Sequence, residues 1–186
     1  ILNKEGGLTI TDLIKGKIKP RNLQVILLKT YEEIVKKFKI DDITERYESN
    51  RFVQPSKLSQ KELLKFDHIA YDIISSDFES IELSPVSPMG TNAVLANIDQ
   101  KNILSAVRSI EVNADVTTAL ALECAIKRKK LILQNSLESI KETNLCTSQR
   151  SIRSQSFPEN SGFTPHFKMF AACTAARDVG DEEFES

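Results

Sequence analysis

Residues 145–176 read LCTSQRSIRSQSFPENSGFTPHFKMFAACTAA, and the fold that we expect for the chain is built around them. Residues 145–155 and 163–176 both have the character of β-strands, and the second is strongly apolar. The residues between them, 156–162, are rich in Ser, Pro, Asn and Gly, which favour loops. The pattern therefore predicts a long β-hairpin with a polar tip.

Helices are predicted on the N-terminal side of this hairpin. Ser59-Gln60-Lys61-Glu62 is a capping box, in which a serine and a glutamate three residues later satisfy each other's backbone N–H groups. An apolar stripe follows it at helical spacing, made of Leu63, Phe66, Ile69, Ala70 and Ile73. A second helix is expected over 119–133, capped by Thr117 or Thr118.

Between these helices, residues 78–86 are predicted to form a strand that Pro85 and Pro88 close, and residues 103–112 alternate loosely, as in a strand. Residues 89–100 are expected to be irregular. Capped helices interleaved with proline-bounded strands predict an α+β fold, a mainly antiparallel sheet with packed helices.

The first 50 residues are predicted to be helical, with Pro20 at a helix start. The polar residues 48–55 end at a proline and are interpreted as a linker. We therefore divide the chain into an N-terminal helical segment and linker, 1–55, and an α+β core, 56–186.

Composition excludes several classes of protein. The 25 Lys+Arg against 26 Asp+Glu give a net charge of −1, which provides no field for a general nucleic-acid or anionic-membrane binder. No apolar run approaches the roughly 18–20 residues of a membrane span. The usual glycine-rich phosphate loops are missing. The three cysteines lack metal or dithiol spacing, so no metal site is expected and a reducing cytoplasmic setting is the natural interpretation.

The hairpin holds the side chains that point to chemistry. Its outgoing strand carries Arg150, Arg153 and Gln155, and its return strand carries His166, Phe167 and Lys168. A guanidinium can clamp a phosphate, and an aromatic ring across the hairpin can stack on a base. Lys168 should point to the opposite face from Phe167, which makes it a control residue. The alternative is that the arginines lie on the surface and Phe167 belongs to the core.

The order of these parts resembles class II aminoacyl-tRNA synthetases, in particular the histidyl type and its non-charging relatives. The resemblance covers residues 59–178 and includes Ser80-Ile81-Glu82-Leu83-Ser84-Pro85-Val86, Asp115-Val116-Thr117-Thr118-Ala119-Leu120 and Arg150-Ser151-Ile152-Arg153-Ser154-Gln155. The return strand, Thr164-Pro165-His166-Phe167-Lys168-Met169-Phe170, completes the family's second motif, in which an Arg precedes a Glu and a Phe follows a variable loop.

The resemblance implies roles for six residues. Arg153 would contact the α-phosphate of ATP as the catalytic residue, and Phe167 would stack on adenine. Gln155 and His166 would also belong to the nucleotide site, although Gln155 replaces the glutamate of the motif. Asp115 and Thr117 would line the amino-acid pocket. ATP with Mg²⁺ is the cofactor that the resemblance implies.

The function expected from the resemblance is ATP-dependent adenylation of an amino acid or another carboxylate, which is a ligase reaction. Residues 1–186 contain no third motif, the Gly-rich strand and helix with a second ATP arginine, so the core is interpreted as incomplete. One alternative is a non-catalytic paralogue that acts as a binding or regulatory module, and another is an unrelated α+β structural domain. The family implies a homodimer, whereas tRNA is a possible partner that the net charge does not support.

Overall fold

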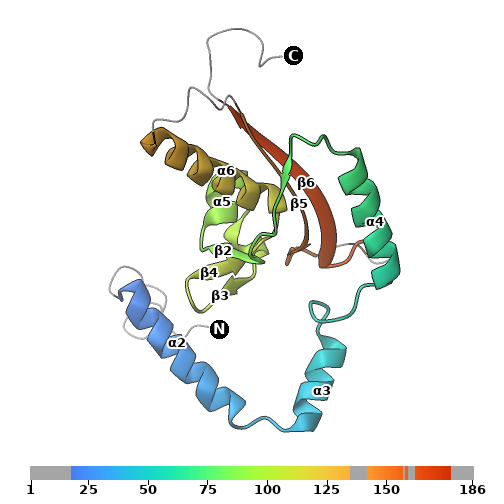
Figure 1. Cartoon of the computed structure of the whole chain (residues 1–186). Helices are drawn as coiled ribbons and strands as arrows, with labels where there is room; N and C mark the ends of the chain where they lie inside the picture. The colour runs from blue at the N-terminus through green and yellow to red at the C-terminus, as the bar shows by residue number, and fades with distance from the viewer. Residues whose placement is uncertain (1–17, 135–141, 157, 159–161, 177–186) are drawn as a thin grey trace.

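The chain has an α+β fold, as the sequence predicts. The computed structural model describes residues 18–134, 142–156, 158 and 162–176. Two small sheets are present in these residues, with the strand orders β1-β5-β6 and β2-β4-β3. Helices lie against the larger sheet, and two further helices extend away from it (Figure 1).

The predicted hairpin is confirmed as the centre of the larger sheet. Its strands are β5 (Glu142–Ile152) and β6 (His166–Ala176), which pair antiparallel from Glu142↔Ala176 to Ile152↔His166. The short β1 (Glu79–Ser80) pairs parallel to β5. The ladder stops at the loop because Pro165 has no N–H group to donate, although its carbonyl still accepts from Arg153 N at 2.8 Å.

Helix α6 (Val116–Leu133) covers one face of the hairpin and forms the core with it. Val116, Leu120, Cys124, Leu145 and Ala171 are all buried in this cluster. Helix α4 (Gln60–Ile73) lies on the other face, where Tyr71 and Phe170 make an edge-to-face pair with ring centroids 5.1 Å apart. Side chains of alternate residues along each strand therefore face different helices.

The capping box of α4 is confirmed. Ser59 Oγ accepts from the Glu62 N–H at 3.2 Å, and the Glu62 carboxylate accepts from the Ser59 N–H at 2.7 Å. The cap predicted for the next helix was wrong, because Asp115, and not a threonine, is the N-cap residue of α6. Its carboxylate accepts from the Thr117 N–H at 3.0 Å, and a carboxylate also interacts favourably with the helix dipole.

The strand predicted over 78–86 is interrupted. Only β1 and β2 (Val86–Pro88) are strands, and β2 pairs antiparallel with β4 (Ile110–Val112). β3 (Ser105–Ala106) pairs on the other side of β4, so the strand expected over 103–112 is a small hairpin. Residues 89–100, expected to be irregular, include the helix α5 (Thr91–Ala96) and the first residue of the 3₁₀ helix η1 (Gln100–Asn102).

Glu111 organises this second sheet. Its carboxylate is fully buried and accepts hydrogen bonds from the N–H groups of Gly90 and Asn92, the amide of Asn92 and the amide of Gln100, at 2.8–2.9 Å. Gly90 adopts a φ of 94°, a conformation that a glycine takes without strain. These bonds explain why a polar stretch folds into α5.

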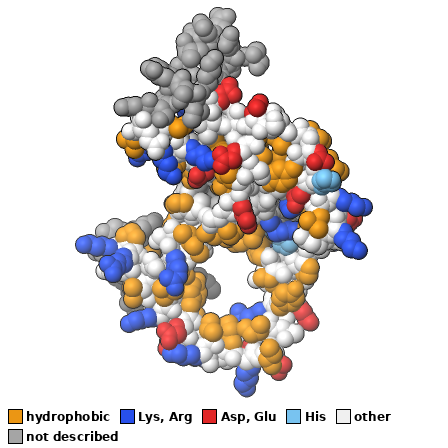
Figure 2. Space-filling model, viewed as in Figure 1, with side chains coloured by type: hydrophobic (Ala, Val, Ile, Leu, Met, Phe, Trp, Pro, Cys, Tyr) orange, Lys and Arg blue, Asp and Glu red, His pale blue; other side chains and the backbone are white. Residues whose placement is uncertain are grey.

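The N-terminal helices α2 (Pro20–Val35) and α3 (Ile40–Ser49) bury none of their residues. They extend away from the sheets (Figure 1), and Figure 2 shows apolar side chains along them. The linker after them leads into α4. The division of the chain into two parts at residue 55 remains a prediction. Among the described residues, no helix is both long and apolar enough to cross a membrane.

Candidate functional site

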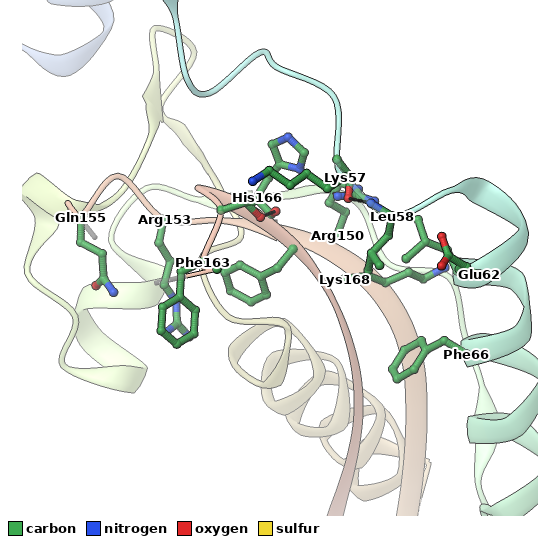
Figure 3. Close-up of a pocket in the computed structure, with 15 residues that line it drawn as sticks. Lys57, Leu58, Glu62, Phe66, Arg150, Arg153, Gln155, Phe163, His166 and Lys168 are labelled. Atoms are coloured by element: carbon green, nitrogen blue, oxygen red, sulfur yellow. Dashed lines mark hydrogen bonds between the residues drawn. The ribbon is translucent and has the colours of Figure 1, made fainter. Parts of the chain in front are cut away.

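A cavity of about 990 Å³ lies where the N-terminal turns of α4 approach the loop end of the hairpin (Figure 3). Its lining is mainly apolar, with several basic side chains. The lining residues are Ser56, Lys57, Leu58, Glu62, Leu63, Phe66, Arg150, Arg153, Gln155, Gly162, Phe163, Thr164, His166, Phe167 and Lys168. Four of the six predicted site residues, Arg153, Gln155, His166 and Phe167, are therefore brought together.

Arg153 is held in place from two sides. Its Nε donates to the carbonyl of Ala114 at 2.9 Å, and its Nη2 donates to the Asp115 carboxylate at 3.1 Å. The centre of its guanidinium lies 5.3 Å from the centroid of the Phe167 ring, within cation–π distance. Two of five N–H donors are used in these bonds, so the guanidinium is oriented and still has donors for a ligand.

Asp115 joins the site through Arg153 and does not line the cavity. The same carboxylate accepts from the Thr117 hydroxyl at 2.7 Å and from the Thr117 N–H. Thr117 is exposed and lies outside the lining. The predicted amino-acid pocket at Asp115 and Thr117 is thus adjacent to the cavity, and the structure shows these residues as the cap of α6.

His166 connects the hairpin to the linker before α4. Its Nε2 lies 2.6 Å from the carbonyl oxygen of Gln54, and its Nδ1 lies 2.8 Å from Nη1 of Arg150. The carbonyl can only accept and the guanidinium can only donate, so the imidazole is neutral and carries its proton on Nε2. His166 therefore orients Arg150 and has no ring nitrogen left to bind a nucleotide directly.

Gln155 lines the cavity and lies next to a contact that no sequence pattern indicates. Arg51 donates to the carbonyls of Ser154 and Gln155 at 2.7 and 3.0 Å. The linker residues Arg51 and Gln54 thus hold the loop end of the hairpin. No periodicity or motif marks such contacts, because they join residues more than 100 positions apart.

Lys168 is not a suitable control residue, because it lines the cavity. It does point to the α4 face, as alternation predicts, and its Nζ forms an ion pair with Asp67 of α4. Asp67 also accepts from the Ser148 hydroxyl at 2.5 Å. However, the curvature of the hairpin end brings both of its faces to the cavity, so Lys168 lines it beside Phe167.

The cavity combines aromatic rings with positive charge. Phe66, Phe163 and Phe167 line it, together with the cations Lys57, Arg150, Arg153 and Lys168. Among the described residues, Glu62 is the one carboxylate in the lining. Hydrogen bonds from Ser59 keep the pKa of Glu62 below its usual value, so it stays ionised as a cap. A ligand with an aromatic ring and anionic groups matches this arrangement.

A protein-held Mg²⁺ site does not fit this lining. Mg²⁺ prefers several oxygen ligands in octahedral geometry, and Glu62 already accepts from the Ser59 N–H. In the described part of the chain, no group of three or more His, Cys, Asp or Glu side chains is placed to hold a metal.

The fold and the cavity together define an α+β protein with a basic, aromatic-lined site at the end of a hairpin. No protein-family model matches the chain, and no curated protein matches it. Among solved structures, the chain is similar to an ATP phosphoribosyltransferase regulatory subunit/histidyl-tRNA synthetase from Bacillus halodurans, with a TM-score of 0.40 and 13% identity. The match covers 64% of this chain and 30% of that one, so the relation is distant.

Proposed function

We propose that this chain is a synthetase-like binding module that takes a nucleotide, ATP in the first instance, between Arg153 and Phe167. The observation that carries the proposal is the fixed pair of these two side chains in one cavity, with the guanidinium centre 5.3 Å from the ring. Phe167 offers an apolar surface for the base, and the remaining donors of Arg153 point to a role in binding the α-phosphate.

The dimensions of the cavity support a ligand of this size. Small-molecule sites occupy about 300–1,000 Å³ and combine an apolar lining with a few placed polar groups. The 990 Å³ cavity has this character, with basic groups near the hairpin and the apolar Leu58, Leu63 and Phe66 from the α4 side. A nucleotide would place its ring and its phosphates against different parts of this lining.

The second candidate function is adenylation of an amino acid or another carboxylate. The position of Arg153 favours it, because an oriented guanidinium would offset charge that develops on an α-phosphate. Gln155 in place of a glutamate and the misfit to a protein-held Mg²⁺ favour binding without catalysis. Any Mg²⁺ would then arrive with the phosphates of ATP.

The proposal extends to partners and setting. The exposed apolar face of α4, with Phe66, Ile69 and Ile73, supports a homodimer. Three cysteines that form no disulfide, Cys124, Cys146 and Cys173, are consistent with a reducing cytoplasm. Near-neutral net charge gives tRNA binding no support.

Calorimetric titration of ATP, with and without Mg²⁺, tests the proposal. We expect weak binding to the parent chain. Arg153→Ala removes the charged contact and should reduce the free energy of ATP binding by about 1.5–3 kcal/mol. Phe167→Ala removes the stacking surface and should reduce it by about 1–3 kcal/mol. Arg108→Ala is the control, because Arg108 is exposed on the turn between β3 and β4 and does not line the cavity.

No binding of ATP by the parent chain would contradict the proposal. Equal losses in Arg153→Ala, Phe167→Ala and Arg108→Ala would show that general charge, and not this site, attracts the nucleotide. Adenylation is tested separately, by amino-acid-dependent exchange of pyrophosphate into ATP. Exchange above background would favour the second candidate, and binding without exchange would favour the binding module.

A further inference from the structure

We propose that Arg150 forms a second anion subsite in this cavity, and that the ligand therefore carries at least two phosphoryl groups, as a nucleoside di- or triphosphate does. The proposal rests on the nucleotide-binding function proposed above and names its substrate class. It assigns the end of the phosphate chain to the face of the hairpin that α4 covers, and not to Arg153.

The charge balance of the lining carries this inference. Arg153 is paired with Asp115, and Lys168 is paired with Asp67. Among the described residues, the polar partner of Arg150 is only the neutral imidazole of His166. Its positive charge is therefore uncompensated, although the side chain is half-buried. A partly desolvated cation without a counter-charge is costly, and a bound anion would offset that cost.

The strand register makes the positive charge stronger at this position. Arg150 and Lys168 are direct partners across the β5–β6 ladder. Like charges directly opposite each other destabilise an antiparallel pair, and the one carboxylate of Asp67 is shared between Lys168 and Ser148. Lys57 also lines the cavity and makes no ion pair with any described residue (Figure 3).

The orientation of the Arg150 guanidinium is also fixed, by its contact with His166. The Gln54 carbonyl fixes His166, and His166 Nδ1 accepts from Nη1 of Arg150, which leaves Nε and Nη2 without a partner in the described residues. These two atoms lie on one edge of a guanidinium, the edge that binds a phosphate through two parallel hydrogen bonds. Arg150 and Lys168 also line the neighbouring cavity of about 360 Å³, so a phosphate chain has room beside them.

The test compares AMP, ADP and inorganic pyrophosphate as ligands of the parent chain, Arg150→Met and Arg108→Met. We expect the parent and Arg108→Met to bind ADP about tenfold or more tightly than AMP, because a bidentate phosphate contact contributes at least this much. Arg150→Met should bind AMP as the parent does and lose the preference for ADP. Arg150→Lys, which keeps the charge without the fork, should restore part of it.

The inference would be overturned if Arg150→Met kept the preference for ADP. It would also be overturned if Arg150→Met lost affinity for AMP and ADP equally while its unfolding midpoint stayed unchanged. Pyrophosphate separates this result from failure of the proposed function. If pyrophosphate binds in a way that depends on Arg150, while AMP does not bind and ADP binds no more tightly than pyrophosphate, the anion subsite is retained and the nucleotide is rejected as the ligand. No binding of pyrophosphate or ADP by the parent would overturn both.

Discussion

The Asp115 carboxylate holds Arg153 and caps α6 at the same time. One oxygen accepts from Arg153 Nη2 at 3.1 Å, and the other accepts from the N–H and hydroxyl of Thr117 at 3.0 and 2.7 Å. The beginning of the core helix and the arginine of the candidate site are therefore coupled through one side chain. A change in the cap should change the site.

Asp115→Ala should destabilise the fold and misplace Arg153. Loss of an N-cap costs about 0.5–2 kcal/mol, and loss of the partly buried ion pair adds about 1 kcal/mol. Urea unfolding of Asp115→Ala, Arg153→Ala and the double variant measures the coupling. Lys129→Ala is the control, since Lys129 is exposed near the other end of α6 and this change should alter stability little. Additive effects of the two single changes would show that the pair does not act as a unit.

Glu111 should make the stability of the fold depend on acid pH. Burial raises the pKa of Glu111, but hydrogen bonds from Asn92, Gly90 and Gln100 together outweigh burial and lower it below the ordinary 4.5. A carboxyl whose pKa is lower in the folded state stabilises it above the unfolded pKa. This contribution is therefore complete above pH 4.5 and is lost as the pH falls through the folded value.

Glu111→Gln should remove this part of the acid dependence and lower stability at neutral pH. The amide cannot accept all four hydrogen bonds, and each buried donor left unsatisfied costs about 1–3 kcal/mol. Urea unfolding as a function of pH measures both effects, and the exposed Glu45→Gln is the matched control. If Glu111→Gln follows the same acid profile as the parent, the buried carboxylate does not titrate as described.

Local sequence signals predicted the elements that depend on local physics. The Ser59–Glu62 capping box and the hairpin could be read from spacing alone, and both are present. The cap of α6 was missed because Asp115, Thr117 and Thr118 are all good N-caps, and the choice depends on Arg153, which lies 38 residues further along the chain.

Contacts between distant residues could not be predicted. Residues 89–100 look like a polar loop, and it is the buried Glu111, more than ten residues further along the chain, that supplies acceptors for the N–H groups at the start of α5. The same applies to the candidate site. The hairpin pattern predicts Phe167 and Arg153 as site residues. The position at which α4 docks decides the rest, namely the linker contacts of Arg51 and Gln54 and the lining by Leu58 and Phe66.

The ion pair between Asp67 and Lys168 should tie α4 to the hairpin. Burial raises the pKa of Asp67, but hydrogen bonds from Lys168 and Ser148 outweigh this and hold the pKa below its ordinary value. In a double-mutant cycle with Asp67→Asn and Lys168→Met, we expect a coupling of about 0.5–3 kcal/mol in urea unfolding. The pair of Lys36 with Glu32 on α2 is exposed and serves as the comparison, with a coupling near zero. Equal coupling in both pairs would contradict a docking role.

Cys124 should be inert to thiol reagents in the folded protein. Burial, together with the neighbouring Cys173, raises the pKa of its thiol to about 12, so very little thiolate forms at neutral pH. Burial also raises the pKa of Cys146. Labelling followed by peptide mass analysis should modify the half-buried Cys173 first and Cys124 and Cys146 only with unfolding in urea. Fast labelling of Cys124 without denaturant would show that α6 opens locally.

Helix α4 should form the contact between two copies of the chain. Phe66, Ile69 and Ile73 are exposed by 42%, 58% and 78% and lie on one face of a helix whose only buried residue is Leu63. An apolar face of this kind marks an interaction surface. A two-fold dimer needs such a self-complementary patch, and Ile69→Glu would place two like charges in its interface. Sedimentation velocity over a concentration series should show a dimer for the parent and a monomer for Ile69→Glu, with an unchanged circular dichroism spectrum. Val25→Glu on α2 is the matched control, because Val25 is also exposed, by 47%, but lies on the arm. A parent chain that stays monomeric throughout the series would contradict the dimer, and dissociation by Val25→Glu in place of Ile69→Glu would move the contact from α4 to the N-terminal helices.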